Sequence, residues 1–171
     1  VSYSPADEII VTVGGSEAID LALRALVGPG DEVIIPEPSF VAYKPCAALT
    51  GATPVPLPLD EADEFRLTPE KLLSALTPRS KILVFPFPNN PTGAIMRRED
   101  IARIADIIVD RNLVVLSDEI YAELSYDGPH VSIASFPGMR DRTVLINGFS
   151  KAYAMTGWRL GYAAGHPALI A

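Results

Sequence analysis

Lys151 and Arg159 are the two residues in this sequence most directly suited to chemistry. They stand in the run from Asn147 to Tyr162, NGFSKAYAMTGWRLGY, with the small hydroxyl residue Ser150 just before the lysine. A lysine amine attacks aldehydes to form a Schiff base, and an arginine nearby can bind a phosphate through two parallel hydrogen bonds. The pair favours a ligand with both groups, although an exposed lysine before an ordinary strand is an alternative for this run alone.

Asp118 adds a second group with chemical potential. It ends an apolar strand in VVLSDEIYAEL, residues 114–124, where an unpaired carboxylate is costly. A protonated pyridine nitrogen is a suitable partner, because the carboxylate keeps the nitrogen protonated and the ring then withdraws electrons. Tyr121, placed within the helical turn that follows, can hydrogen-bond a phenolic oxygen. With Lys151, these groups indicate pyridoxal 5'-phosphate, while a helix cap is the simpler interpretation of an isolated Ser-Asp-Glu.

The run VTVGGSEAI suits the phosphate of such a ligand. An apolar strand leads into Gly14 and Gly15, and a helix is expected to begin at Ser16. The free amides and positive dipole at a helix N-terminus attract anions, and glycines allow close backbone approach. The run lacks the GxGxxG pattern, which counts against a dinucleotide-binding fold.

Two further segments follow strand ends. IPEPSFVAY, residues 35–43, places Phe40 and Tyr43 where an aromatic ring can lie over a planar cofactor, although for this segment alone core packing is the favoured interpretation. PNNPTG, residues 88–93, forms a rigid turn that directs the amide of Asn90 into a pocket.

The elements that position these residues alternate along the chain. Short runs rich in Val, Ile and Leu are typical of strands buried on both faces of a parallel sheet. Strands are expected near residues 8–13, 32–35, 53–57, 81–85, 113–117, 143–147 and 160–164. Helices are expected over 16–27, roughly 40–50, from Thr68 as N-cap with Pro69 in the first helical position, and near 98–110. Ligands bind at strand ends in such sheets, and the motifs lie there.

The motifs GGSEAI, PSFVAY, NNPTG, SDEIY and SKAYAMTGWRLGY, in this order and spacing, resemble the class I aminotransferases of pyridoxal-phosphate fold type I, similar to aspartate aminotransferase. The resemblance extends over nearly the whole chain. It implies an α/β fold, the three-layer α/β/α large domain, with a seven-stranded, mostly parallel sheet whose last strand is antiparallel. It also implies transfer of an amino group from an amino acid to a 2-oxo acid in two half-reactions.

The same resemblance implies a role for each motif residue. Lys151 is the Schiff-base lysine and proton shuttle, Asp118 pairs with the pyridinium, and Phe40 stacks on the ring. Tyr121 and Asn90 bind the phenolic oxygen.

Arg159 supplies the charge that binds the phosphate, and the turn and helix amides contribute from Gly15, Ser16 and Glu17. The chain departs from the pattern at one position. Many relatives carry a phosphate-binding serine three residues before the lysine, where this chain has Gly148. Ser150 is the expected substitute.

Residues 1–171 are expected to be one domain of a longer protein that works as a homodimer. An N-terminal segment and a C-terminal small domain, with the arginine that binds the substrate carboxylate, are expected outside it. Two alternatives remain open. A lyase, decarboxylase or cyclopropane-forming enzyme of the same fold shares the motifs, and a transcription regulator can carry such a domain as a ligand sensor.

Composition narrows the class of protein. The chain has 171 residues, 49% of them hydrophobic, and a net charge of −7 with dispersed acids, which indicates neither a nucleic-acid surface nor a membrane surface. A lone cysteine fits a reducing compartment, so a cytoplasmic location is expected. No Cys/His/Asp cluster predicts a metal site. Other residues are expected to be structural: Cys46 buried, His130 exposed, His166 in a turn, Trp158 in the core or an interface, and 60–65 in a solvated loop.

Overall fold

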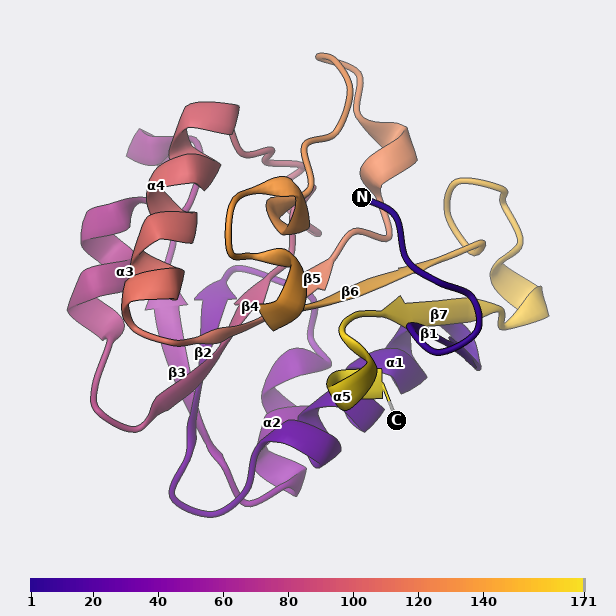
Figure 1. Ribbon diagram of the computed structural model, residues 1–171. Helices are drawn as coiled ribbons and strands as arrows, with labels where there is room; N and C mark the ends of the chain where they lie inside the picture. Colours follow the sequence, from indigo (N-terminus) through magenta and orange to yellow (C-terminus); the bar gives the residue numbers. More distant parts are fainter. Residues whose placement is uncertain (171) are drawn as a thin grey trace.

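The computed structural model describes residues 1–170, which form a seven-stranded sheet in the order β1-β7-β6-β5-β4-β2-β3 (Figure 1). The strands are β1 (Ile9–Thr12), β2 (Glu32–Glu37), β3 (Thr53–Pro58), β4 (Ser80–Phe85), β5 (Val114–Asp118), β6 (Thr143–Gly148) and β7 (Gly161–Ala164). Only β7 runs antiparallel to its neighbours, β1 and β6; the other neighbouring pairs are parallel. The predicted sheet, with its last strand antiparallel, is confirmed.

Two apolar clusters, one on each face of the sheet, explain the near-continuous hydrophobic strands. On β2 and β4, Ile34 and Leu83 pack toward α3 and α4, whereas Val33 and Ile82 pack toward α1 and α2. Side chains alternate between the two faces along a strand, so a strand covered on both sides must be apolar throughout. The result is three layers, helix, sheet and helix, as predicted.

The helices are α1 (Gly14–Leu26), α2 (Tyr43–Leu49), α3 (Pro69–Ala75), α4 (Arg98–Asp110) and α5 (Pro167–Ile170). Single 3-10 turns occur at Glu61–Asp63, Ala122–Leu124, Ile133–Ser135, Arg140–Arg142 and Thr156–Trp158. Thr68 caps α3 as predicted, because its hydroxyl accepts a hydrogen bond from the Lys71 amide with Pro69 in the first turn. Helix α4, predicted near 98–110, buries one apolar stripe: Ile101, Ile104, Ala105 and Ile108.

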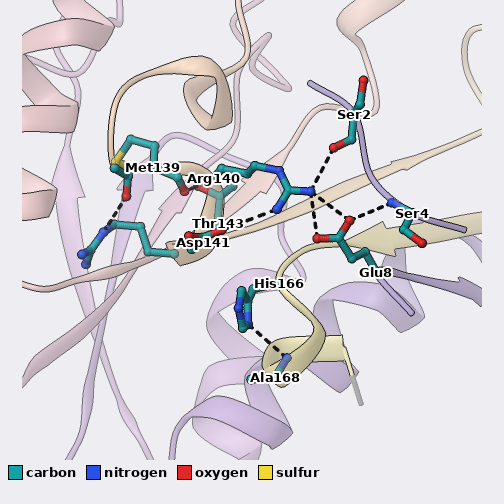
Figure 2. Close-up of polar contacts among 11 residues, drawn as sticks. Ser2, Ser4, Glu8, Met139, Arg140, Asp141, Thr143, His166 and Ala168 are labelled. Atoms are coloured by element: carbon teal, nitrogen blue, oxygen red, sulfur yellow. Dashed lines mark hydrogen bonds and ion pairs between the residues drawn. The ribbon is translucent and has the colours of Figure 1, made fainter. Parts of the chain in front are cut away.

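Several expectations about individual positions are wrong. Helix α1 begins at Gly14, two residues before the predicted start at Ser16, because Gly14 has a φ of +75° that turns the chain directly from β1 into the helix. Cys46 is only partly buried, since α2 is a short surface helix. Trp158 is 75% exposed, so of its two expected places, the core or an interface, only the core is excluded. His166 does lie in a turn, where its ring accepts a hydrogen bond from the Ala168 amide (Figure 2).

The segment before β1 is attached to the turn before β6. Figure 2 shows Arg140 reaching the Ser2 carbonyl and both carboxylate oxygens of Glu8, and its guanidinium also lies 4.8 Å from the centre of the Tyr3 ring. Residues 2–8 are thereby held against the sheet next to β1. Within residues 1–170, no helix has the length and apolar character needed to cross a membrane.

Candidate active site

A cavity of about 230 Å³ lies at the carboxyl ends of the parallel strands. The segments after β2, β4, β5 and β6 meet there with the N-terminal turn of α1, as expected for ligand sites in open α/β sheets. Nine of the ten predicted site residues line it: Gly15, Ser16, Phe40, Asn90, Asp118, Tyr121, Ser150, Lys151 and Arg159. The exception is Glu17, whose carboxylate instead accepts a hydrogen bond from the Val13 amide before α1.

Lys151 stands at the mouth of this cavity. Its ammonium nitrogen lies 5.6 Å from the centre of the Tyr121 ring, so the turn after β6 and the turn after β5 bring amine and phenol together. Lys44, Lys71 and Lys81 each form an ion pair with a carboxylate at 3.0 Å or less. Among the described residues, Lys151 is the one lysine without such a pair. Its amine is therefore available to a ligand.

Asp118 is buried at the end of β5, and each of its oxygens accepts one hydrogen bond. The Tyr43 hydroxyl donates to Oδ2 at 2.7 Å, and the Ile120 amide donates to Oδ1 at 3.2 Å. Burial raises the pKa of Asp118, and the adjacent Glu119 carboxylate raises it further, while the two hydrogen bonds lower it. Asp118 thus caps the following turn and also borders the cavity. Its position fits both the helix-cap interpretation and the interpretation as a partner for a ligand cation.

Tyr43 is a core residue, as the interpretation favoured for its segment alone predicts. Its ring is 2% exposed, and Phe40 packs edge-on against it with ring centroids 5.8 Å apart. Its contact with Asp118 was missed, although a buried tyrosine hydroxyl requires a hydrogen-bond partner. Tyr121 also differs slightly, since it lies in an irregular turn just before the 3-10 turn.

Arg159 lies over the first turn of α1. Its guanidinium donates to the Thr156 carbonyl at 2.9 Å and approaches the Ser150 hydroxyl at 3.5 Å. A Cβ on Gly14 would lie only 2.4 Å from the guanidinium, so glycine is required for the arginine to sit there. The arrangement combines a cation, a hydroxyl and the free amides of a helix N-terminus, which is a donor set for a phosphate.

Gly148 has a structural explanation. A Cβ at this position would lie 3.0 Å from the Gly161 Cα and 3.0 Å from the Leu160 carbonyl oxygen, because β6 and β7 approach each other closely there. A serine at position 148 would therefore need the strands to shift. Ser150, which is buried and lines the cavity, is the hydroxyl that this chain places beside Arg159.

His130 is not the exposed loop residue that was expected. Its Nε2 lies 2.9 Å from the buried Glu119 carboxylate, which also accepts hydrogen bonds from the Ser117 and Ser132 hydroxyls. This network ties the loop before Ser132 to the end of β5. Nothing in the local sequence signals it, because the partners come together only through the fold of the loop.

A larger, open groove of about 850 Å³ runs along β1, β6 and β7. The titratable side chains that line it within the described residues are Tyr3, Glu119, Glu123, His130 and Tyr162, with neither a lysine nor an arginine. It therefore lacks a lysine side chain to form a Schiff base and an arginine side chain to bind a phosphate. The smaller cavity around Lys151 is the candidate active site.

The Lys151 amine, a buried carboxylate and an anion cradle lie together at the strand ends of a three-layer α/β sheet, and this set of groups suits an amine-reactive, phosphate-bearing ligand. Comparison with known proteins gives the family. The family model "Aminotransferase class I and II" matches residues 1–171, and the chain belongs to this family.

The relatives are aminotransferases of several specificities. The chain is 50% identical to "Putative aminotransferase YugH" of Bacillus subtilis over 99% of its residues, and 45% identical to an aspartate aminotransferase of Pyrococcus abyssi over 96%. The aromatic aminotransferase structure from Pyrococcus horikoshii superimposes with a TM-score of 0.97 at 44% identity, over 99% of this chain and 46% of that one. The chain spans 44% and 42% of the lengths of the first two relatives.

Proposed function

We propose that residues 1–171 are the cofactor-binding large domain of a pyridoxal-phosphate-dependent aminotransferase. The observation that carries the proposal is the convergence on one cavity of Lys151 and Arg159, from the segment between β6 and β7, with Asp118 at the end of β5. Family membership supports the reaction class, and the names of the relatives support amino acids and 2-oxo acids as substrates. A homodimer and a cytoplasmic location are part of the same proposal.

The residues fit the cofactor. Gly14 leaves room for the Arg159 guanidinium, and the buried Asp118 lacks a cationic partner among the described residues, as a carboxylate reserved for a ligand cation would. Arg159, Ser150 and the amides of Gly15, Ser16 and Glu17 would hold the phosphate. Phe40 would cover the ring, and Tyr121 and Asn90 would donate to its phenolic oxygen.

The chemistry is divided between the ligand and the chain. When bound, pyridoxal phosphate supplies an electron-withdrawing ring that stabilises negative charge at the substrate α-carbon. Asp118 keeps the proton on the ring nitrogen, and this proton increases that withdrawal. The Lys151 amine would act as the base that moves the proton at the substrate α-carbon. Tyr121 lies next to this amine and orients it.

A labelling experiment tests the proposal. The full-length protein is mixed with pyridoxal phosphate, reduced with borohydride and digested, and the labelled peptide is mapped by mass spectrometry. We expect the label on Lys151, and a Lys151→Arg variant should lose both the label and transamination. Lys81→Arg is the matched control, because Lys81 is already paired with Asp31 and lies outside the cavity. A label on Lys44, Lys71 or Lys81 with none on Lys151 contradicts the assignment.

A further inference from the structure

Tyr43 and Asp118 form a buried pair whose members stand 75 positions apart in the sequence. Tyr43 begins α2 and Asp118 ends β5, so their contact depends on how α2 packs against the sheet. Both residues line the candidate active site. The hydrogen bond joins α2, which lies outside the segments that carry Lys151 and Asp118, to the Asp118 carboxylate.

The Asp118 carboxylate keeps unused acceptor capacity after its two hydrogen bonds. A carboxylate offers about four lone-pair positions, and only one donor reaches each oxygen here. The Ile120 amide belongs to the turn that Asp118 itself starts, so it cannot fix the side chain against the rest of the fold. The Tyr43 hydroxyl comes from another element and can do so.

The charges around Asp118 show why this donor matters. Lys151, Arg159 and Tyr121 border the same cavity, but none of them forms a hydrogen bond or ion pair with Asp118 among the described contacts. Glu119 beside it is a like charge. Burial raises the pKa of Asp118, and the hydrogen bond from the Tyr43 hydroxyl is the strongest influence that lowers it. Burial in turn raises the pKa of Tyr43 well above its usual value, so Tyr43 stays a proton donor.

We propose that Tyr43 is a positioning residue for the reaction: its hydroxyl donates a hydrogen bond to Asp118 and fixes the direction of the carboxylate toward the cavity. Asp118 then keeps the proton on the ring nitrogen of the cofactor, so this inference rests on the proposed function. Without the Tyr43 hydroxyl, the Asp118 carboxylate is more basic. It then competes with the ring nitrogen for the proton, and a smaller fraction of the ring nitrogen is protonated.

The first test needs no cofactor. The Asp118 carboxyl is followed by carbon NMR through a pH titration of the full-length protein, with Tyr43→Phe compared with the parent. Since a hydrogen bond to a charged group is lost, we expect the pKa of Asp118 to rise by about one unit. Tyr3→Phe is the matched control, because the Tyr3 hydroxyl is buried with no hydrogen-bond partner in the described residues and should leave the titration unchanged.

The second test uses the loaded protein. With less positive charge at the ring nitrogen, the proton on the Lys151 nitrogen is held to higher pH. The visible absorbance of bound pyridoxal phosphate should therefore change at higher pH in Tyr43→Phe, and kcat should fall about tenfold. In an Asp118→Asn background, Tyr43→Phe should add nothing to either effect, because Tyr43 acts through that carboxylate.

The outcomes separate the possible roles. An unshifted Asp118 titration in Tyr43→Phe, or an equal loss of kcat with and without the Asp118 carboxylate, overturns the proposal and leaves Tyr43 a packing residue. If Tyr43→Phe does not fold, 3-fluorotyrosine at position 43 gives a stronger donor and must lower the pKa of Asp118. Failure of the parent to bind pyridoxal phosphate overturns the proposed function, while the cofactor-free titration still decides the role of Tyr43.

Discussion

The Asp118 carboxylate is buried and, within residues 1–170, receives two hydrogen bonds, one from Tyr43 and one from Ile120. Burial of a carboxylate favours its neutral form, as the raised pKa of Asp118 reflects. Such a residue becomes more stable as an anion when a cation binds beside it. We therefore interpret Asp118 as a site prepared for a positively charged ring nitrogen and not primarily as a helix cap.

Asp118→Asn tests this interpretation. The amide keeps the shape of the side chain but cannot hold the ring nitrogen in its protonated form. We expect pyridoxal phosphate still to bind while kcat for transamination falls by about a hundredfold or more, equivalent to roughly 3 kcal/mol of barrier. Steady-state kinetics and cofactor absorbance measure the two effects. Asp106→Asn on the exposed side of α4 is the control, and near-normal turnover in Asp118→Asn would show that the carboxylate serves the turn alone.

Single residues differ in how far sequence alone could place them. Lys151, Asp118 and Asn90 follow strand ends, and strand ends are visible in the sequence as the limits of apolar runs. The partners of Tyr43 and His130 are not visible in this way, because each contact forms between segments whose distance is set by tertiary packing. Glu17 is different, because its contact is local. Its carboxylate accepts a hydrogen bond from the Val13 amide, four positions earlier, and its side chain does not line the cavity.

At the scale of elements, the anion cradle depends on the meeting of β1, α1 and the turn before β7. Gly14 turns the chain from β1 into α1 with a φ of +75°, and Arg159, itself at a φ of +50°, places its guanidinium directly over that glycine. The absence of a side chain at Gly14 thus permits both the backbone turn and the close approach of the arginine.

Gly14→Ala should break both conditions. The left-handed φ costs about 1–3 kcal/mol with a side chain present, and the added methyl displaces Arg159 from its position. We expect a lower melting temperature and a roughly tenfold higher Kd for pyridoxal phosphate, as expected from about 1.4 kcal/mol of lost binding. Thermal denaturation measures the melting temperature, and equilibrium dialysis measures the Kd for pyridoxal phosphate.

Gly30→Ala separates the two effects. Gly30 also has a positive φ, +98°, but nothing lies within 4 Å of its Cβ position. This variant should lose stability without losing cofactor affinity. Equal Kd values for the Gly14→Ala and Gly30→Ala proteins would contradict the assignment of Arg159 to the phosphate.

Periodicity predicted the elements well where a long amphipathic pattern exists. The bounds of α4 match the predicted 98–110, because its buried stripe repeats over more than three turns. The start of α1 was misplaced, since glycines are poor helix formers and only the backbone shows that Gly14 and Gly15 already belong to the first turn. The single antiparallel strand followed from the family resemblance and could not be derived from the pattern of β7 itself.

At the scale of the whole molecule, the described surface carries large apolar side chains close to the candidate site. Tyr153 and Trp158 in the turn that follows Lys151, and Val41 beside Phe40, are strongly exposed. Solvated aromatic and aliphatic groups near a catalytic cavity are typical of surfaces that pack against another domain or subunit. Their position agrees with the proposal that the active enzyme contains more than these residues.

The last prediction concerns residues 1–171 expressed alone, without any other part of the full-length protein. Lys151 and Arg159 are exposed here, so water reaches the site, and the substrate is not held in a reactive orientation. We expect weak binding of pyridoxal phosphate, self-association through the exposed aromatic surface, and no measurable transamination of aspartate, aromatic amino acids or alanine with 2-oxoglutarate. Cofactor titration, light scattering and a coupled assay measure these, with the full-length protein as the positive control. A Trp158→Ser variant of the isolated chain should associate less than its parent, because it removes the largest exposed ring. Robust turnover by residues 1–171 alone would contradict the prediction and would mean that this domain holds the substrate without help.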